Sequence, residues 1–405
     1  MKRRLLPILM TLVLVCALPI WAAFVTSGDV TNPLVCTAGA SEPNLRGMIE
    51  QANAGATITL NSNTEIAATL QITKNLTLDL NGHVLKMTGS GSVLKVSDRA
   101  TLTIQDSSAN GTGTITGGNA EYGGGVYVDD YAALKMTGGC ITGCHASRGG
   151  GGIYSSGNLY MGGTAKIEKC TGSDDAIWNR EKSDIYADGG TVDGTVNNQG
   201  TIKRSEGAAA VTVFNGTVYN RSAGTIIAGI YNGTVENNGT ISGGTFCGGV
   251  TIRKGSWVWE RTGSISGGTF YSSIVNEAGP ERVTGVTFAV TFDRGDGTKT
   301  EPTPVKYNDL VPKPTAPTKS GYTFTGWEDA NGAYDFNTPV TGPLTLTAKW
   351  EKVPSSGGNY YYHPTTDTKA DDAKGSPKTA DPGVALYAAL SLLSLTGLTC
   401  TAKKR

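Results

Sequence analysis

Two acidic pairs with an arginine between them are the residues of this chain that could carry acid–base or metal-assisted chemistry. They are Asp129-Asp130 and Asp174-Asp175, and Arg148 falls between the pairs. Carboxylates on neighbouring segments can hold Ca²⁺ beside a basic residue, which is the requirement of a polysaccharide lyase. Two carboxylates facing each other across a groove can instead hydrolyse a glycosidic bond.

Acidic pairs at chain corners are more often solvated turn residues, and no third pair matches these two in frame. We therefore expect no catalytic residues, no cofactor and no metal site. The alternative is a polysaccharide-active enzyme, a lyase or a glycoside hydrolase, with its groove near residues 125–190.

The segment that must position these residues is a Gly-, Thr- and Asn-rich run from about residue 57 to residue 285. A polar residue followed by two glycines recurs there, in several places at intervals of about 20–25 residues, and such self-similarity is typical of a solenoid. The recurrences are Thr116-Gly117-Gly118, Thr137-Gly138-Gly139, Met161-Gly162-Gly163, Ser242-Gly243-Gly244 and Ser266-Gly267-Gly268.

Apolar residues between the glycines alternate with threonines, which predicts short half-buried strands. Examples are Ile58 and Leu60, and Leu76, Leu78 and Leu80. No helical stripe of ten or more residues lies between these strands, which argues against a leucine-rich or helical repeat. Strands joined by tight glycine corners predict a parallel β-helix.

Later coils share one frame of strand, asparagine turn, glycine and strand, and asparagines at such turns can bond their own backbone. The frame occupies residues 195–202, 217–226 and 234–241, and Gly239–Phe246 recurs almost unchanged as Gly263–Phe270. On this pattern the run from residue 41 to 285 resembles the pectate-lyase-like superfamily. The resemblance implies a right-handed β-helix and says little about activity.

The charge of the chain is balanced, with 34 basic and 34 acidic residues and only 17% charged residues. Such a chain offers no electrostatic footprint for nucleic acid or an anionic membrane. Its 56 glycines fit an extracellular all-β repeat protein.

Residues 1–23 have the basic start, apolar run and small residues of a secretory signal peptide. Lipidation at Cys16 is a weaker alternative, because Val15 precedes it where a small residue is usual. Residues 41–54 follow as a predicted amphipathic helix with Leu45, Met48, Ile49 and Ala52 on one face. We expect this helix to cap the open end of the β-helix.

Cys144 and Cys170 occupy matching positions in successive coils, after Ile141-Thr-Gly and Ile167-Glu-Lys. Their Cα atoms are expected about 5 Å apart, within reach of a disulfide. Two buried reduced thiols are an equally good interpretation.

The regular recurrence of glycine pairs stops near residue 285. Residues 286–352 predict a small independent β domain. Its phrases Gly-Tyr-Thr-Phe-Thr-Gly-Trp327 and Leu-Thr-Ala-Lys-Trp350 resemble the internalin-type B repeat, or Listeria-Bacteroides repeat, a β-grasp-like module. Its expected core is Phe292, Tyr322, Phe324, Trp327, Phe336, Leu346 and Trp350. Sugar stacking by Trp327 and Trp350 is the weaker alternative.

After a polar linker, residues 353–375, the chain ends in Ser376-Pro377-Lys378-Thr379-Ala380, an apolar stretch from Val384 to Ala402, and Lys403-Lys404-Arg405. This order resembles the sorting signal of Gram-positive surface proteins, although Ser376 and Ala380 replace the usual Leu and Gly. The resemblance implies a sortase that cuts after Thr379 and joins it to peptidoglycan. A plain tail-anchored membrane protein is the alternative.

Together these features predict an all-β chain with a right-handed parallel β-helix solenoid, followed by a β-grasp-like repeat domain. The expected function is that of a secreted, wall-anchored adhesin or surface scaffold. Its expected partners are sortase and peptidoglycan through Thr379, then host or environmental glycans or proteins, but no nucleic acid. Contact with the membrane is expected only through residues 376–405, before sorting.

Overall fold

The structure is a computed structural model that describes residues 34–35, 42–172, 176–255 and 262–354. The signal peptide of residues 1–23 and the sorting residues Ser376, Pro377, Lys378, Thr379 and Ala380 lie outside this part of the chain, as do Asp174 and Asp175. Within the described part, no helix is both long and apolar enough to cross a membrane.

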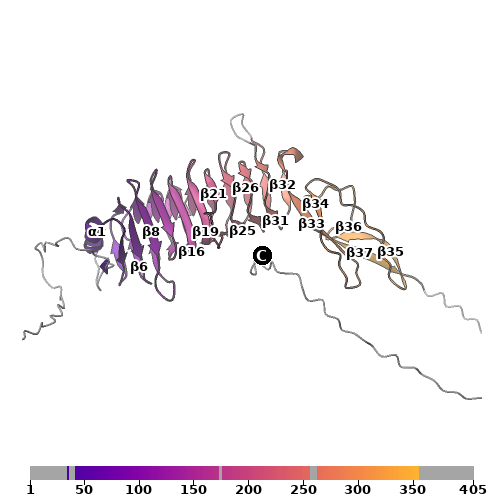
Figure 1. The fold of residues 1–405 in the computed structure, drawn as a ribbon, viewed down its shortest axis with the longest axis horizontal. Helices are drawn as coiled ribbons and strands as arrows, with labels where there is room; N and C mark the ends of the chain where they lie inside the picture. Colours follow the sequence, from indigo (N-terminus) through magenta and orange to yellow (C-terminus); the bar gives the residue numbers. More distant parts are fainter. Residues whose placement is uncertain (1–33, 36–41, 173–175, 256–261, 355–405) are drawn as a thin grey trace, which may run out of the picture. The chain divides into compact units, whose positions relative to one another are not determined.

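The described chain is all-β, and its larger part is a parallel β-helix, as predicted (Figure 1). Each regular coil contributes three short strands. One column of strands forms a ten-stranded sheet in which every pairing is parallel. Its strands, from one end to the other, are β4 (Leu70–Ile72), β7 (Leu94–Val96), β11 (Val126–Val128), β15 (Ile153–Ser155), β18 (Ile177–Asn179), β20 (Val196–Asn198), β23 (Val218–Asn220), β26 (Val235–Asn237), β29 (Val250–Ile252) and β32 (Ile274–Asn276).

The other two columns of strands join into one 19-stranded sheet because β16 and β19 are long enough to belong to both columns. The column that follows the ten-stranded sheet contains β1 (Leu34–Val35), β2 (Ala56–Thr59), β5 (Leu76–Asp79), β8 (Thr101–Gln105), β12 (Ala133–Met136), β16 (Asn158–Glu168), β19 (Asp184–Val192), β21 (Thr201–Lys203), β24 (Thr225–Ile226), β27 (Thr240–Ile241) and β30 (Ser264–Ile265). The next column adds β3 (Thr64–Ile66), β6 (Val84–Met87), β9 (Thr114–Thr116), β13 (Cys140–Thr142), β22 (Val213–Phe214), β25 (Ile230–Tyr231), β28 (Thr245–Phe246) and β31 (Thr269–Phe270).

A third, three-stranded sheet lies in the connections between coils. It contains β10 (Asn119–Tyr122), β14 (His145–Gly149) and β17 (Thr171–Gly172), again paired in parallel.

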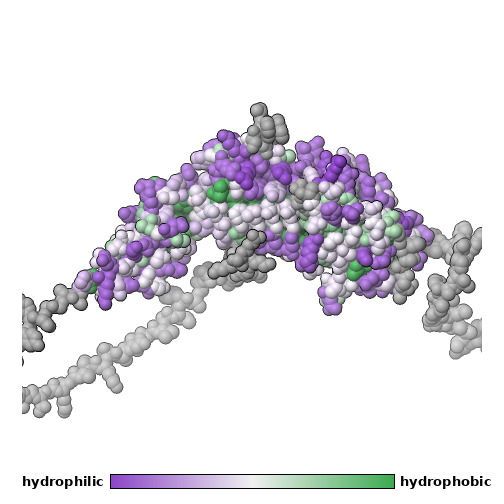
Figure 2. All heavy atoms as spheres, turned by 180° about the vertical axis from the view of Figure 1, so that it is seen from behind, coloured by the Kyte–Doolittle hydropathy of each residue, from purple (hydrophilic) through white to green (hydrophobic). Residues whose placement is uncertain are grey.

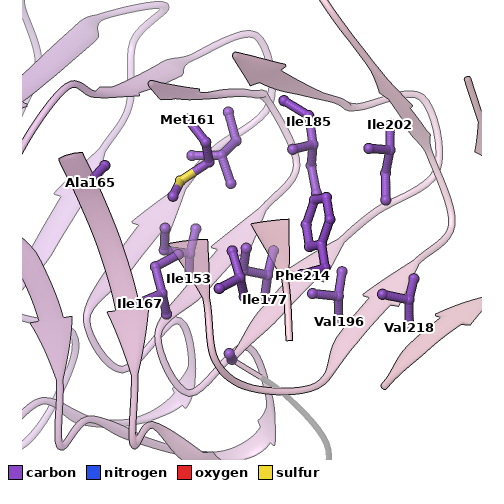
Figure 3. Close-up of a cluster of buried hydrophobic side chains, with 14 of the residues drawn as sticks. Ile153, Met161, Ala165, Ile167, Ile177, Ile185, Val196, Ile202, Phe214 and Val218 are labelled. Carbon is purple, nitrogen blue, oxygen red and sulfur yellow. The ribbon is translucent and has the colours of Figure 1, made fainter. Parts of the chain in front are cut away.

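The predicted inward stacks form the core of the solenoid. Val196, Val218 and Val235 stand opposite one another, as do Ile202, Ile226 and Ile241. Figure 3 shows such side chains pointing into the interior from neighbouring coils. In contrast, the outer face in Figure 2 is mainly hydrophilic, with its hydrophobic residues scattered. Period-two alternation therefore partitions these strands into an apolar inner face and a polar outer face.

Stacked aromatic rings extend the core toward the later coils. Phe214, Tyr231, Phe246 and Phe270 lie in one column, with successive ring centroids 5.0, 4.9 and 4.7 Å apart. Burial raises the pKa of Tyr231 well above its ordinary value. Its hydroxyl donates to the carbonyl of Ala228 at 2.7 Å, so the buried polar atom is satisfied.

Buried asparagines form a ladder at the ends of four strands of the ten-stranded sheet. The Nδ2 atoms of Asn179, Asn198 and Asn220 donate to the Oδ1 atoms of Asn198, Asn220 and Asn237, at 2.8, 2.8 and 2.7 Å. Asn179 and Asn198 also donate to the nearby backbone carbonyls of Ser183 and Gly200. The ladder forms because identical turns stack coil on coil, so each amide also meets the next one.

The predicted N-terminal helix is α1 (Glu42–Gln51), and it buries Leu45 and Ile49 in the same apolar cluster as the first coils. Figure 1 shows α1 beside these coils. Arg46 donates from Nη1 to the carbonyl of Thr69 at 3.1 Å, and Lys74 donates from Nζ to the carbonyls of Glu50 and Ala52 at 2.7 and 2.9 Å. The helix therefore covers apolar side chains of the first coils and ties its own backbone to them.

After a short 3₁₀ helix, η1 (Pro280–Arg282), the chain forms a five-stranded mixed sheet. Its strands in order are β34 (Thr303–Lys306), β33 (Thr287–Asp293), β37 (Leu344–Lys352), β35 (Tyr322–Asp329) and β36 (Gly332–Ala333). Phe292, Trp327 and Leu346 are buried, as predicted, whereas Phe324, Phe336 and Trp350 are half-buried.

The prediction that Tyr322 belongs to this core is wrong, since its side chain is 39% exposed and lies under the Nζ of Lys319. The register of β35 shifts between Phe324 and Gly326. That irregularity turns both Phe324 and Trp327 toward the core, although their spacing breaks the alternation. Trp350 donates from Nε1 to the carbonyl of Arg294 at 2.8 Å, which anchors its indole ring within the sheet.

Candidate functional site

Of the residues considered for acid–base chemistry, Asp129 and Arg148 form ion pairs with other side chains in the structure. Asp129 follows β11, where its Oδ2 lies 3.7 Å from Lys95 Nζ and its Oδ1 accepts the amide of Asp130. Arg148, on β14, pairs through Nε with Glu121 Oε1 at 2.9 Å. Among the described residues, no three His, Cys, Asp or Glu side chains gather closely enough to hold a metal ion.

An aromatic cluster lies on the outer face of the ten-stranded sheet. Tyr127, Tyr154 and Trp178 occupy equivalent positions of β11, β15 and β18, and Lys95 precedes them on β7. The rings of Tyr127 and Tyr154 stack at 5.0 Å, and Tyr122 of β10 approaches Tyr154 at 4.9 Å. Partial burial, reinforced by Tyr154 and Asp129, raises the pKa of Tyr127, so its phenol stays protonated at neutral pH.

A hollow of about 520 Å³ lies between this sheet and β10. Gln71, Lys95 and Tyr127, which are neighbours across β4, β7 and β11, line it with Tyr122 and Asn119 of β10. Both faces of the Tyr127 ring are already covered, one by Tyr154 and the other by Lys95 Nζ at 5.2 Å. This hollow therefore offers polar groups beside the rings of Tyr122 and Tyr127.

A second cavity, a slot of about 460 Å³, lies where the ten-stranded sheet turns into the next column of strands. Four residues connect β11 to β12, and four connect β18 to β19, but only Ser156 and Gly157 connect β15 to β16. The shorter connection leaves a gap between two longer turns. Tyr131 lines the gap from one turn, and Arg180, Glu181 and Lys182 line it from the other.

The cysteine pair adopts the reduced alternative. Cys144 and Cys170 are free thiols. The thiol of Cys144 donates to the carbonyl of Thr142 at 3.5 Å, and that of Cys170 donates to the carbonyl of Ile141 at 3.7 Å. The interaction of the two thiols lowers the pKa of Cys144 and raises that of Cys170. Cys140 is also free, and burial raises its pKa to about 11.

The sequence did not lead us to predict Tyr131, Arg180 and Lys182 as site residues, because only the carboxylates and Arg148 of this region were considered. A sequence signal existed, because Tyr131 stands in a turn where glycine or asparagine is usual. The short connection formed by Ser156 and Gly157 can also be recognised in the sequence. The stacking of these three turns could not be predicted, because it depends on the strand register.

Comparison with known proteins gives a local match. Residues 288–349 match the Listeria-Bacteroides repeat domain family. The chain is 36% identical to Internalin H of Listeria monocytogenes serovar 1/2a over 95 residues, which is 22% of this chain and 16% of that protein. It is also 35% identical to a Gly-rich membrane protein of Evansella cellulosilytica over 68 residues, 16% of this chain and 8% of that one.

These relatives are much longer than the matched parts, so the chain spans less than a fifth of either of them. No solved structure matches the chain significantly. The matches support an internalin-like bacterial surface or membrane-associated protein.

Proposed function

We propose that this chain is a sortase-anchored surface protein of a Gram-positive bacterium, acting as an adhesin or surface scaffold. The observation that carries the proposal is the order of parts along the sequence. A segment matching the Listeria-Bacteroides repeat at residues 288–349 precedes a sorting-like end at residues 376–405. The signal-like start at residues 1–23 agrees with export.

The proposed anchoring reaction exchanges one amide for another. A sortase breaks the peptide bond between Thr379 and Ala380, and the carbonyl carbon of Thr379 is transferred to an amine of a peptidoglycan cross-bridge. The fragment from Ala380 to Arg405 leaves with a new amino terminus. The apolar stretch from residue 384 to 402 and the terminal Lys403-Lys404-Arg405 would hold the substrate at the membrane until cleavage.

The β-helix supports a role in display. Its repeating coils place outward side chains about 4.8 Å apart along each column, so weak contacts to a repetitive partner can add. Equal numbers of basic and acidic residues leave the chain without net charge, and some of them pair along the outer face, such as Arg253 with Glu236 and Glu277. An exposed scaffold of this composition resists non-specific association with charged polymers.

Cell fractionation tests the anchoring. In a Gram-positive host with active sortase, muramidase digestion should release the chain, cut after Thr379, as a ladder of muropeptide-linked species. Mass spectrometry should find a C-terminal peptide that ends at Thr379 and carries cross-bridge residues. Thr379→Ala should move the protein to the membrane fraction, while the control Thr366→Ala in the linker should not.

Equal membrane association of both variants, with an intact C-terminus through Arg405, would show a tail-anchored protein instead. That result would overturn the sortase proposal and leave the display role to be judged by binding.

A further inference from the structure

We propose that the slot between the turns at residues 129–132 and 180–183 binds one pyranose ring of a neutral glycan, stacked on Tyr131. The inference deepens the adhesin role and rests on that proposed function. It is independent of the hollow beside β10, because the slot lies in the connections to the next column of strands.

The width of the slot follows from the stacking of coils. Successive coils are separated by about 4.8 Å, so two turns that flank a shortened one lie roughly 9–10 Å apart. Atoms of the two walls take up part of this distance, and what remains accommodates a single ring. The floor is the Ser156-Gly157 connection, where the amide of Ser156 donates to the carbonyl of Val128 at 2.9 Å.

The Ser156-Gly157 connection cannot easily move outward into the slot. A Cβ atom placed on Gly157 would lie 2.0 Å from the carbonyl oxygen of Ala132, so this position accepts glycine alone. The shortened turn is thus held low between its neighbours. The short connection thus forms the floor of the cavity, and the exposed side chains of Tyr131, Arg180 and Lys182 line its walls.

Tyr131 gives the slot an aromatic wall. Its side chain is 81% exposed, and the guanidinium carbon of Arg99, from the preceding turn, lies 5.5 Å from the ring centroid. Tyr131 lines the slot, and the proposed sugar would pack on the ring face that Arg99 leaves free. The C–H groups on one face of a pyranose carry partial positive charge and pack favourably on the negative face of an aromatic ring.

The backbone of Tyr131 is left-handed, with a φ angle of +62°. Arg99 and Lys182 have φ angles of +62° and +69° at the equivalent positions of neighbouring turns, so this conformation is a property of the turn. What distinguishes Tyr131 is that it places an exposed aromatic ring at the slot.

The polar groups around the slot fit a neutral ligand. Arg180 and Lys182 are balanced by Asp130 and Glu181, so the lining carries two positive and two negative charges. These groups, with Ser156 and Asn158, supply both donors and acceptors for sugar hydroxyls. A balanced lining gives no net field to select a charged polymer.

The test uses the full chain in a sugar-free zwitterionic detergent on an array of neutral and uronic-acid oligosaccharides. The best neutral ligand is then titrated calorimetrically at about 0.1 and 1 M NaCl. We expect binding that changes little with salt, because salt screens interactions between charges and a neutral sugar carries none. Tyr131→Asn should weaken it at least about tenfold, or about 1.4 kcal/mol.

The variants separate loss of the ring from loss of the fold. Asparagine suits a left-handed turn, so Tyr131→Asn should keep or raise the thermal midpoint. Tyr131→Phe keeps the ring and should keep the affinity. Tyr271→Asn, which removes a tyrosine that is 61% exposed elsewhere, is the matched control and should bind normally.

Undiminished binding by Tyr131→Asn, binding of uronic-acid chains alone with a steep loss in salt, or no carbohydrate binding would each overturn the inference. Its failure is distinguishable from failure of the anchoring proposal. A wall-linked chain that binds no sugar refutes only the slot, and a sugar-binding chain with an intact C-terminus refutes only the sorting.

Discussion

At the scale of single residues, the same amide–amide hydrogen bond occurs in two settings in this protein. Asn198 is fully buried, donates to Asn220 Oδ1 at 2.8 Å and to the carbonyl of Gly200 at 3.0 Å, and accepts from Asn179. Asn232 donates to Asn215 Oδ1 at an identical 2.8 Å, but near solvent. Water can replace the exposed hydrogen bond between Asn232 and Asn215, but it cannot readily replace the buried bond between Asn198 and Asn220.

We therefore predict that Asn198→Ala lowers the free energy of unfolding by about 3 kcal/mol, because it leaves buried amide and carbonyl groups unpaired. Asn215→Ala should change it by less than about 0.5 kcal/mol. Urea unfolding followed by circular dichroism measures both. Equal midpoint shifts in the two variants would show that burial does not decide the value of these bonds.

A second residue-scale prediction concerns acid. Partial burial raises the pKa of Asp106, but hydrogen bonds from the Ser108 hydroxyl and from the amides of Gly113, Gly82 and Ser108 outweigh it, and the pKa is lowered. A lowered folded-state pKa contributes stability that is present above the ordinary value of 3.8 and is lost as the pH falls through the folded-state value.

Asp106→Asn should consequently lower the thermal midpoint at neutral pH, and its deficit relative to the unsubstituted chain should shrink below about pH 4. Melting curves between neutral and acidic pH check this. Glu206→Gln, at an exposed carboxylate, controls for general acid effects. A deficit that stays constant with pH would mean that Asp106 acts through shape and not through its charge.

At the scale of elements, the third sheet packs closely on the ten-stranded sheet. A Cβ atom on Gly149 of β14 would lie 1.7 Å from Cε3 of Trp178 on β18. Gly149→Ala should therefore displace the indole and cost about 1–3 kcal/mol. Gly162→Ala is the matched control, since its Cβ atom would approach only Met136 O, at 3.8 Å.

Thermal midpoints of these two variants check the packing. A similar, small change in both would show that β14 moves aside freely. In that case Trp178 would not be held in place by the third sheet.

Sequence patterns predicted the strands and their buried residues correctly where burial of a residue depends only on its own strand. Leu76, Leu78 and Leu80 alternate with polar residues and are buried, because alternation is a local property of a strand. Repeated frames also predicted that Val196 stacks on Val218. Tyr322 was misplaced although it shares a face with Phe324, because it is the first residue of β35 and pairs with Lys352 at the end of β37, where the sheet is exposed to solvent.

The candidate sites were less predictable for the same physical reason. Tyr131, Gly157 and Lys182 belong to three successive turns, and the slot exists only when unequal turns are stacked in register. The aromatic cluster likewise combines Tyr122 of the third sheet with Tyr154 of the ten-stranded sheet. Coil lengths vary in this region, so sequence spacing alone does not align these residues.

At the scale of the whole molecule, the solenoid needs a cover at each end of its apolar core. The column of stacked rings ends at Phe270, whose ring meets Phe288 of β33 edge-on, with centroids 6.4 Å apart. The amide of Ile274 in the last strand of the ten-stranded sheet donates to the carbonyl of Thr341 at 2.8 Å. The five-stranded sheet thus covers side chains and satisfies backbone groups of the final coil.

We predict that a chain ending at residue 285 melts at a lower temperature and binds more of a hydrophobic dye than a chain ending at residue 352. Removing Phe288 and Thr341 exposes Phe270 and leaves the amide of Ile274 to water, so the last coils should fray, and repeat proteins lose stability from uncapped ends. Scanning calorimetry and dye fluorescence on the two chains provide the measurement. Equal melting of the solenoid in both chains would mean that its final coil is stable uncovered, and that the repeat domain contributes reach from the cell surface without contributing stability.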